Sequence, residues 1–313
     1  MLDAAFIHAL QAIGAPVKLD EPLSRHTTIG IGGPADAYVT VEDASQLSKV
    51  VQLAGQAGVP FFVLGSGSNI VVGDRGIRGV VIDNKARAQS DPERRMNGEE
   101  RFVIRAESGA NFAATARHLA FAGYAGMEWA CGIPGTLGGA VVYNAGAYGG
   151  CLGDVLQRIA VATADGDMEL AAADLGLVYR GSDFTRGLMT GRAVLWAEFA
   201  LWRGDETALR AQVADYDERR TKAQPPGRNA GSFFKNPPGH PAWKLLDATG
   251  MRGYQIGGAQ FSPKHCNFLI NAGGATAADV AALKSLAQQR IFEEFGVHME
   301  NEVSLVGEGF GDD

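Results

Sequence analysis

The spacing of apolar residues along the chain predicts a mixture of helices and strands. In several segments apolar residues recur every three or four positions, as on the buried face of a helix; in others they alternate with polar residues or form short apolar runs, as in strands. Helices are predicted over residues 4–13, 44–57, 111–121, 207–222, 242–248 and 276–296. Strands are predicted over residues 36–41, 61–64, 70–72, 80–82, 102–106, 159–164, 168–170, 193–201, 257–262, 266–271 and 297–306.

Local signals fix several element ends. Asn111 is suited to cap the third helix, Thr276 to begin the last helix and Gly296 to end it. Asp165-Gly166, between two strands, predicts a hairpin turn. The charged segment 90–100 is expected to be a solvated hairpin or loop. Because the strands do not alternate regularly with helices, the pattern favours an α+β fold over a doubly wound parallel sheet.

Composition narrows the class of protein. With 313 residues, 46% of them hydrophobic, the chain is long enough to bury more than one core. Its formal charge of −7 argues against a nucleic-acid surface, which needs clustered Lys and Arg. No apolar run approaches the ~18 residues that cross a bilayer, and Asp3 stands where a signal peptide carries positive charge. We expect a cytoplasmic protein without nucleic-acid or membrane partners.

Cysteine and histidine usage predicts neither a disulfide framework nor a metal site. Cys131, Cys151 and Cys266 are an odd number and form no CxxC pair, and the scattered histidines lack metal-ligand spacing. Cys131 lies within a glycine-rich stretch, where a reactive thiol is conceivable but a small buried side chain is favoured.

The glycine-rich stretch from Gly123 to Gly150 is the most informative part of the sequence. Glycines allow backbone amides to approach a ligand closely, and amides in turns and at helix starts bind anions such as phosphate. The alternative is a loop that only turns the chain. Pro134, Tyr143, Asn144 and Tyr148 argue against that alternative, because a flexible linker has no need of such side chains.

A second glycine cluster, GSGSN at 65–69, lies between two predicted strands, where its amides and hydroxyls suit a pyrophosphate. The G-x-G-x-x-G pattern of dinucleotide-binding proteins does not fit, because Ile70 stands at the third glycine position and no helix follows. GIGGPA at 30–35 fails the same test at Ala35. Two such clusters on strand ends predict a nucleotide site better than either alone.

Three residues outside the glycine clusters are candidates for chemistry. Ser232, in AGSFFKNP, could be a nucleophile, a proton donor or a turn residue, although the G-x-S-x-G elbow of nucleophilic serines is missing. Arg180, in VYRGSDF, could pair with a substrate carboxylate or lie on the surface. Glu302, on the last predicted strand, points away from the apolar face, which usually means solvent.

Together, these motifs resemble one enzyme family. The resemblance runs from about Arg25 to Gly307, and the family is UDP-N-acetylenolpyruvoylglucosamine reductase. Its motifs here are GSGSN at 65–69, GIPGTLGGAV at 132–141, NAGAYGG at 144–150, YRGS at 179–182, GSFFKNP at 231–237, Lys264-His265 before FLIN at 268–271, and ENEV at 300–303.

The resemblance implies the domain organisation. It implies an N-terminal helix (1–24), then a two-lobed FAD-binding domain of the vanillyl-alcohol-oxidase type (25–203, with lobes of about 25–83 and 84–203). A substrate-binding α+β domain (204–307) and a short acidic tail (308–313) follow. The chain between YRGS and GSFFKNP has no room for an extra substrate loop, so it resembles the shorter subtype.

The resemblance also implies the site residues. Arg180, Ser232 and Glu302 fall on the three catalytic positions. Substrate contacts are implied for Tyr148, Arg228, Lys235, Asn236 and His265. Cofactor contacts are implied for Gly65, Ser66, Gly67, Ser68, Asn69, Gly132, Ile133, Pro134, Gly135, Thr136, Gly138, Gly139, Asn144 and Gly146.

The implied activity is that of a UDP-N-acetylmuramate dehydrogenase in peptidoglycan precursor synthesis. NADPH reduces non-covalently bound FAD, and the hydride then passes to the methylene carbon of UDP-N-acetylglucosamine enolpyruvate. Arg180 and Glu302 would stabilise the resulting enolate, Glu302 best as a protonated hydrogen-bond donor, and Ser232 would protonate the adjacent carbon. The protein is expected to act as a monomer.

Two alternatives belong to other classes. A different flavin oxidase could use the same cofactor fold, and His26 is the one candidate for the covalent flavin link that such relatives often form. A nucleotide-binding module that senses a UDP-sugar would keep the glycine clusters. It would have no reason to carry Arg180, Ser232 and Glu302 together.

Overall fold

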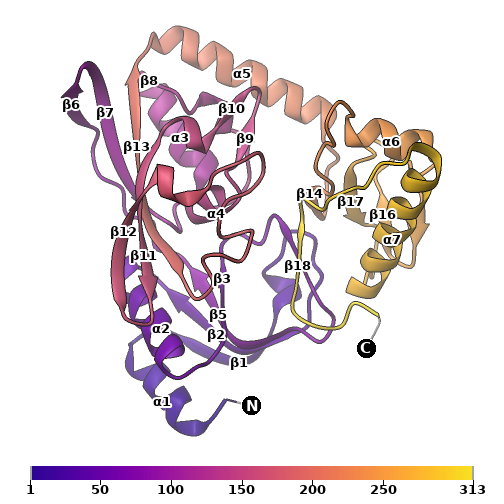
Figure 1. The fold of residues 1–313 in the computed structure, drawn as a ribbon, viewed down its shortest axis with the longest axis horizontal. Helices are drawn as coiled ribbons and strands as arrows, with labels where there is room; N and C mark the ends of the chain where they lie inside the picture. The colour runs from indigo at the N-terminus through magenta and orange to yellow at the C-terminus, as the bar shows by residue number, and fades with distance from the viewer. Residues whose placement is uncertain (1, 312–313) are drawn as a thin grey trace. The chain divides into compact units, whose positions relative to one another are not determined.

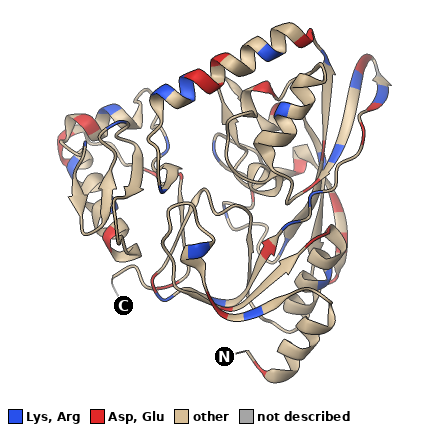
Figure 2. Ribbon diagram, turned by 180° about the vertical axis from the view of Figure 1, so that it is seen from behind, with Lys and Arg blue, Asp and Glu red and all other residues tan. Residues whose placement is uncertain are grey.

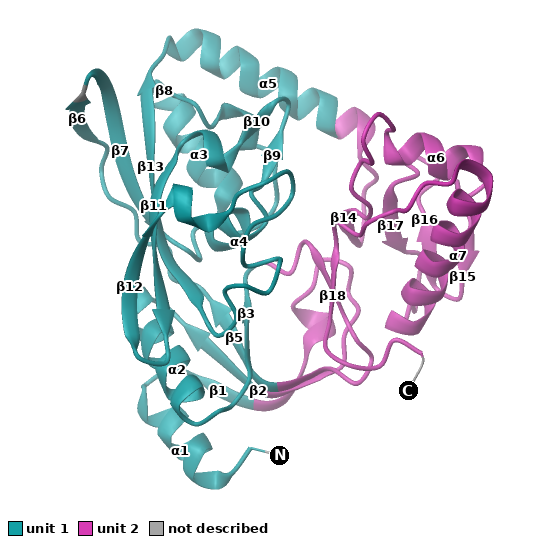
Figure 3. Ribbon diagram, viewed as in Figure 1, with its two compact units in different colours: residues 1–18, 37–65, 79–220 teal, residues 19–36, 66–78, 221–313 magenta. Residues whose placement is uncertain are grey.

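The computed structural model describes residues 2–311, and contacts within the chain divide it into two compact units (Figure 3). Unit 1 consists of residues 1–18, 37–65 and 79–220, and unit 2 of residues 19–36, 66–78 and 221–313. Each unit therefore draws on three separate segments of sequence. Asp312 and Asp313 of the expected acidic tail lie outside the described residues.

Unit 1 begins with helices packed on a small sheet (Figure 1). α1 (Ala4–Ala12) and α2 (Ala44–Gln56) bury one face each, and Leu10, Val50 and Ile82 share a single core. The sheet order is β1-β2-β5-β3, with β3 parallel to β5. Its strands are β1 (Val17–Pro22), β2 (Pro34–Val41), β3 (Phe61–Leu64) and β5 (Ile77–Asn84).

The larger sheet of unit 1 is antiparallel, in the order β12-β11-β13-β7-β6, with β8 paired to β13. Phe112 and Trp129 pack edge to face, with ring centroids 5.9 Å apart, in the core that this sheet covers. The strands are β6 (Glu93–Asn97), β7 (Glu99–Glu107), β8 (Tyr124–Ala125), β11 (Leu156–Thr163), β12 (Gly166–Ala171) and β13 (Ala193–Arg203).

Further helices and short strands complete this part of the chain. α5 carries charged residues of both signs along its length, as expected of a polar helix (Figure 2). The elements are α3 (Phe112–Phe121), α4 (Leu137–Val142), α5 (Glu206–Ala223), β9 (Gly146–Ala147) and β10 (Gly150–Cys151), with single 3₁₀ turns at Glu128–Ala130, Leu152–Asp154 and Ala172–Leu175.

Unit 2 has a four-stranded antiparallel sheet with two helices (Figure 1). Phe233, Phe234 and Phe261 form the centre of its core, each no more than 1% exposed. β4 and β18, far apart in sequence, pair in parallel. The elements are β4 (Ile70–Val72), β14 (Asn229–Ser232), β15 (Gln255–Ile256), β16 (Ala259–Phe261), β17 (Phe268–Asn271), β18 (Ser304–Val306), α6 (Ala242–Ala248), α7 (Ala277–Phe295) and a 3₁₀ turn at Leu23–Arg25.

Most predicted elements are confirmed, and two predictions are corrected. The strand predicted over 297–306 is a regular strand only from Ser304, where β18 pairs with the three-residue β4; before it, Asn301 forms an isolated bridge with Phe234. GIPGTLGGAV, expected to be loop, contains α4, which Thr136 caps by accepting a hydrogen bond from Gly139 N. Asn111 caps α3 and Thr276 caps α7, as predicted. Among residues 2–311, every helix is too short or too polar to span a bilayer.

Candidate functional site

The first two residues of α4 are tied to the segment just before α3. Leu137 N donates to Ala110 O at 2.9 Å, and Gly138 N donates to Ser108 O at 2.7 Å. These two amides, and that of Gly139, are engaged within the chain. A ligand at Gly138 and Gly139 would therefore make van der Waals contact with the backbone and would not accept hydrogen bonds from these N–H groups.

Gly139 points to a ligand for a different reason. Glycine inside a helix destabilises it by roughly 1 kcal/mol relative to alanine. A Cβ at position 139 would meet only Thr136 Oγ1, at 3.7 Å, so packing does not demand glycine there. Open space beside an unsubstituted Cα is what the close approach of a cofactor requires.

In unit 2, residues 66–69 of the GSGSN loop pack against the segment that contains His26 and Thr28. Gly67 has a φ of +63°, and a Cβ there would lie 2.2 Å from His26 O, so only glycine fits. Thr28 N donates to Gly67 O at 3.0 Å. Thr28 Oγ1 also donates to Asn229 O at 2.6 Å, which joins the loop to β14.

The same loop is bonded to the predicted catalytic acid. Asn69 Nδ2 donates to Glu302 O at 3.1 Å, and Ser304 N donates to Asn69 O at 3.0 Å. Ser66 and Ser68 hydroxyls lie 3.2 Å apart at the tip of the loop. The structure therefore brings Ser66, Ser68 and Asn69 into one neighbourhood with Glu302.

Ser232 and Glu302 lie next to each other on paired backbone segments. Glu302 N donates to Phe233 O at 2.8 Å, Phe234 and Asn301 form an antiparallel bridge, and Lys235 N donates to Glu300 O at 2.9 Å. We call residues 232–235 with 300–303 the Ser232–Glu302 pairing. Both Ser232 and Glu302 remain partly exposed.

A buried asparagine supports the Ser232–Glu302 pairing. Asn267 is 4% exposed, and its amide bonds both backbone groups of Phe234: Nδ2 donates to Phe234 O at 2.8 Å, and Oδ1 accepts from Phe234 N at 3.0 Å. Its own carbonyl accepts from Phe233 N at 2.7 Å. The chain on either side of Ser232 is thereby fixed to the core of unit 2.

In unit 1, Arg180 occupies a tight turn with a left-handed backbone. Its φ is +54°, which is uncommon for a residue with a side chain. Val178 N donates to Gly181 O at 3.0 Å, and Gly181 N donates to Val178 O at 3.2 Å, so the turn closes on itself. We call residues 178–181 the Arg180 turn. The guanidinium carbon lies 5.3 Å from the Tyr179 ring centroid.

Tyr148 and α5 enclose part of the glycine-rich stretch. The Tyr148 ring stacks on Tyr216, with centroids 4.2 Å apart, and its hydroxyl donates to Tyr216 O at 3.2 Å. Arg220 lies over Gly132 and hydrogen-bonds Tyr148; burial lowers the pKa of its guanidinium, and Tyr148 offsets part of that effect.

Cys131, in the same stretch, is an inert buried residue rather than a reactive thiol. Its side chain is 3% exposed, and burial raises its pKa to about 11. The prediction of a small buried side chain is confirmed.

The remaining predicted substrate residues all lie in unit 2, in different settings. Lys235 is 3.3 Å from Glu300 Oε2, Asn236 Oδ1 accepts from Ala242 N at 2.9 Å, and Arg228 packs against Gly30. His265 is half-buried, and burial lowers the pKa of its imidazole. Two buried atoms of this unit, His265 Nδ1 and Asn301 Oδ1, have no hydrogen-bond partner within residues 2–311, as expected where a ligand completes a site.

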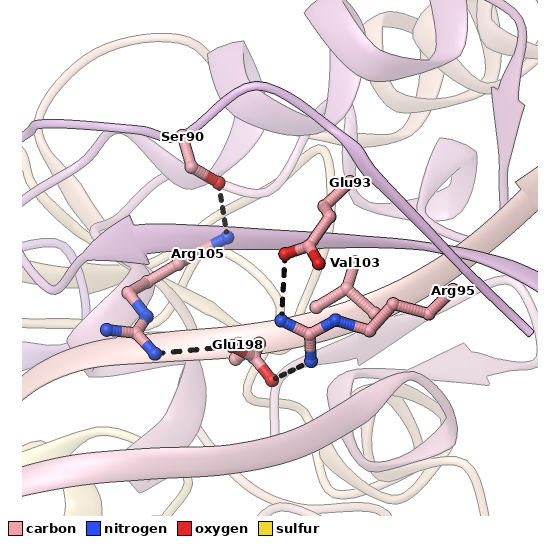
Figure 4. A pocket seen from close by; sticks show the side chains of 6 residues that line it. All are labelled: Ser90, Glu93, Arg95, Val103, Arg105 and Glu198. Atoms are coloured by element: carbon pink, nitrogen blue, oxygen red, sulfur yellow. Dashed lines mark hydrogen bonds and ion pairs between the residues drawn. The ribbon is translucent and has the colours of Figure 1, made fainter. Parts of the chain in front are cut away.

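A pocket of about 260 Å³ on the large sheet of unit 1 was not predicted (Figure 4). It is centred on Glu198, 3% exposed, which accepts hydrogen bonds from Arg158, Arg95 and Arg105 at 3.0, 3.2 and 3.4 Å. Its full lining is Ser90, Glu93, Arg95, Val103, Arg105 and Glu198. The charges within the lining balance, so it is a closed ion-pair network rather than an anion site. Arg105 and Glu198 lie on two predicted strands, 102–106 and 193–201, but only the register of β7 with β13 shows that they face each other.

Comparison with known proteins identifies the family. Residues 222–306 match the C-terminal domain of UDP-N-acetylenolpyruvoylglucosamine reductase, and residues 35–171 match an FAD-binding domain. The chain is 41% identical to the UDP-N-acetylenolpyruvoylglucosamine reductase of Geobacter metallireducens, over 98% of this chain and 100% of the relative. It is 43% identical to that of Desulfosudis oleivorans, over 93% and 95%.

A solved structure agrees with the sequence comparisons. The crystal structure of the reductase from Thermus caldophilus aligns with a TM-score of 0.74 at 30% identity, covering 93% of this chain and 98% of that one. The chain belongs to the UDP-N-acetylenolpyruvoylglucosamine reductase family. The predicted fold class, a vanillyl-alcohol-oxidase-type FAD-binding domain followed by an α+β domain, is confirmed.

Membership of this reductase family makes the chain an FAD-dependent oxidoreductase, as predicted. The residues present fit the cofactor. Gly139 leaves open space for a close approach of FAD, and the Ser66 and Ser68 hydroxyls of the GSGSN loop can donate hydrogen bonds to its pyrophosphate. The individual cofactor contacts, from Gly65 to Asn69 and from Gly132 to Gly146, stay predictions. So do the domain boundaries, which follow the sequence and not the three-segment units.

Proposed function

We propose that this protein reduces UDP-N-acetylglucosamine enolpyruvate to UDP-N-acetylmuramate, with NADPH as the reductant. The observation that carries the proposal is the Ser232–Glu302 pairing. It holds the backbone of Ser232 and the backbone of Glu302 on neighbouring, hydrogen-bonded segments, and Asn69 of the GSGSN loop is bonded to the segment of Glu302. A proton donor and an acid beside a cofactor loop suit the reduction of an activated double bond.

FAD, when bound, supplies hydride transfer from NADPH to the enolpyruvyl methylene carbon. The chain must then stabilise the negative charge that develops on the neighbouring carbon and its carboxylate. Arg180 suits this task, because a guanidinium stays charged at all relevant pH values and its planar fork matches a carboxylate.

Glu302 and Ser232 would complete the step. Glu302 helps most when protonated, because it can then donate a hydrogen bond to the enolate oxygen. Ser232 would protonate the enolate carbon. An aliphatic hydroxyl is a weak acid in water, but a carbanion-like centre is a far stronger base than water, so a positioned hydroxyl suffices.

Binding of the UDP portion is assigned to Lys235 and Asn236, with Tyr148, Arg228 and His265 as further contacts. His265 Nδ1, buried and without a hydrogen-bond partner among the described residues, supports a substrate contact at that position. The proposed activity belongs to peptidoglycan precursor synthesis. A cytoplasmic location and a monomeric state stay predictions from the sequence.

The first experiment uses the purified wild-type protein under anaerobic conditions. We expect a yellow protein that NADPH bleaches and that UDP-N-acetylglucosamine enolpyruvate restores to yellow. A colourless protein that binds no flavin would favour a nucleotide-sensing module instead. Flavin that stays attached after acid precipitation would favour an oxidase with a covalent link at His26.

A second experiment assigns the role of Arg180. Arg180→Lys keeps the charge and loses the planar fork. Reoxidation of the flavin by the enolpyruvyl substrate should therefore slow markedly, while its reduction by NADPH stays near the wild-type rate. Wild-type recolouring in this variant would remove Arg180 from the proposed mechanism.

A further inference from the structure

The Arg180 turn is strained and is not held in place by apolar burial. A residue with a side chain is less stable in the left-handed region than elsewhere, and such a conformation persists only where its surroundings enforce it. Yet Val178 and Tyr179 are 51% and 56% exposed. The restraint on Arg180 must come from polar contacts.

Two buried side chains supply those contacts, one at each end of the turn. Asn144 is 6% exposed, and its Nδ2 donates to Val178 O at 3.0 Å, while its Oδ1 accepts from Gly153 N at 2.9 Å. Ser182 is fully buried, and its Oγ donates to Val142 O at 2.6 Å. Both bonds join the turn to the glycine-rich stretch.

The chemistry of Asn144 suits this position closely. Its own φ is +44°, and asparagine enters that region more readily than most residues. Its amide also provides a donor and an acceptor from one side chain. Aspartate would keep the acceptor for Gly153 N but would lose the donor to Val178 O.

We propose that Asn144 and Ser182 are positioning residues that hold Arg180 in its left-handed turn, ready to face the enolate. The proposal rests on the proposed function, because it assumes that Arg180 acts on the substrate. It gives the Asn144 side chain a different task from the cofactor contact predicted from the sequence. The amide is already engaged with Val178 O and Gly153 N.

The expected effect follows from geometry. A guanidinium stabilises developing charge only when it is aimed at it, and a misplacement of about 1 Å can slow a reaction roughly a hundredfold. Loss of one anchor should therefore slow the substrate half-reaction about ten- to a hundredfold. Hydride delivery from NADPH, which needs no enolate stabilisation, should stay within about twofold of wild type.

The experiment compares Asn144→Asp and Ser182→Ala with a matched control. Gln56→Glu also converts an amide donor into a carboxyl, since Gln56 Nε2 donates to Ala164 O at 3.1 Å in the turn between β11 and β12. Anaerobic stopped-flow measures the two half-reactions separately. Asn144→Gly, which keeps the positive φ and loses both bonds, serves if Asn144→Asp fails to fold.

A second readout needs no substrate. Hydrogen exchange in the FAD-bound protein should show faster deuterium uptake over residues 178–181 in Asn144→Asp and Ser182→Ala, and wild-type uptake in Gln56→Glu. The reason is that the Val178–Gly181 hydrogen bonds open more often once the turn is released. Unchanged uptake in both anchor variants would overturn the proposal.

A double-mutant cycle separates positioning from general damage. In an Arg180→Ala background, Asn144→Asp should add almost no further slowing, because the group it positions is gone. Full additivity would overturn the proposal. So would reoxidation of the flavin at the wild-type rate in both anchor variants if Arg180→Ala reoxidises slowly. If Arg180→Ala itself recoloured at the wild-type rate, the assigned role of Arg180 would fail first.

Discussion

Two buried asparagines, one in each unit, support the residues assigned to chemistry, and they do so differently. Both side-chain hydrogen bonds of Asn267 go to one residue, Phe234, inside an aromatic core. The side-chain hydrogen bonds of Asn144 go to two separate segments, at Val178 and Gly153, and hold an exposed turn in place. The Asn267 bonds complete the regular backbone pairing of residues 232–235 with 300–303. The Asn144 bonds hold a turn that has no such pairing with a neighbouring segment.

The difference teaches where each unit is vulnerable. Around Ser232 the backbone ladder continues through Phe233 and Lys235, so the geometry survives as long as the fold does. Around Arg180 the backbone bonds between Val178 and Gly181 close only the turn itself, and the Asn144 and Ser182 side chains join it to the glycine-rich stretch. Removal of Asn267 should therefore reduce stability, whereas removal of Asn144 should reduce the rate of one chemical step.

The largest expected effect tests the Asn267 half of this comparison. Asn267→Leu leaves buried N–H and C=O groups of Phe234 unsatisfied, which should lower the free energy of unfolding by about 3 kcal/mol. The shift in the urea midpoint measures it. Gln255→Leu is the matched control, because the exposed Gln255 amide also donates to a carbonyl, that of Gly257, and should change stability by less than about 0.5 kcal/mol. Equal shifts would refute the argument from burial.

The next prediction concerns Glu198, a buried residue of unit 1 that we expect to contribute to stability and not to catalysis. Burial raises the pKa of Glu198, but Arg158, with Arg95 and Arg105, outweighs burial and holds the pKa below its usual value. Glu198→Gln should lower stability by about 2 kcal/mol and leave both half-reactions within about twofold of wild type. A slowed half-reaction would show that the Glu198 pocket belongs to the site.

The same variant has a pH signature. Because the carboxylate form of Glu198 is favoured in the folded state, its contribution is complete above the unfolded pKa of about 4.5 and is lost as pH falls through the lower folded value. The Tm of the wild type should therefore fall more steeply than that of Glu198→Gln at acid pH. Parallel curves would contradict the assigned shift.

A smaller effect tests the strain in the Arg180 turn. At most positions alanine is more stable than glycine, but at a left-handed position the order reverses. Arg180→Gly should exceed Arg180→Ala in unfolding free energy by about 1 kcal/mol, while both lose the substrate half-reaction. If Arg180→Ala were the more stable of the two, the turn would not be strained.

The smallest expected effect concerns His265. Burial lowers the pKa of its imidazole, so below about pH 6.5 the unfolded chain binds the proton more readily and the folded state loses stability. Between pH 7.5 and 5.5 the wild type should lose about 1–3 °C of Tm that His265→Gln retains. The exposed His298→Gln is the control and should keep the wild-type decrease.

Local features were predictable from the sequence because they depend on neighbouring residues. The caps Asn111 and Thr276, the hairpin at Asp165-Gly166 and the bounds of α6 are of this kind. Ser232 and Glu302 were also named together as candidates, and their catalytic roles stay predictions. The resemblance supplied that link, not their spacing.

Features that depend on distant contacts could not be predicted. α4 contains two glycines, which disfavour helices, and it forms where its first two residues are bonded to residues 108–110. The task of Asn144 depends on Val178, 34 positions away, and no local pattern marks that bond. The last strand was overestimated because apolar and polar residues alternate before Ser304, whereas residues 297–303 form only the isolated bridge of Asn301 with Phe234.

The central claim is that the residues of the Ser232–Glu302 pairing act only after the flavin has been reduced. The most direct test is a single anaerobic turnover of Ser232→Ala. The account predicts that NADPH bleaches this variant at close to the wild-type rate and that UDP-N-acetylglucosamine enolpyruvate recolours it orders of magnitude more slowly. Recolouring at the wild-type rate would contradict the claim, because the enolate would then take its proton from elsewhere.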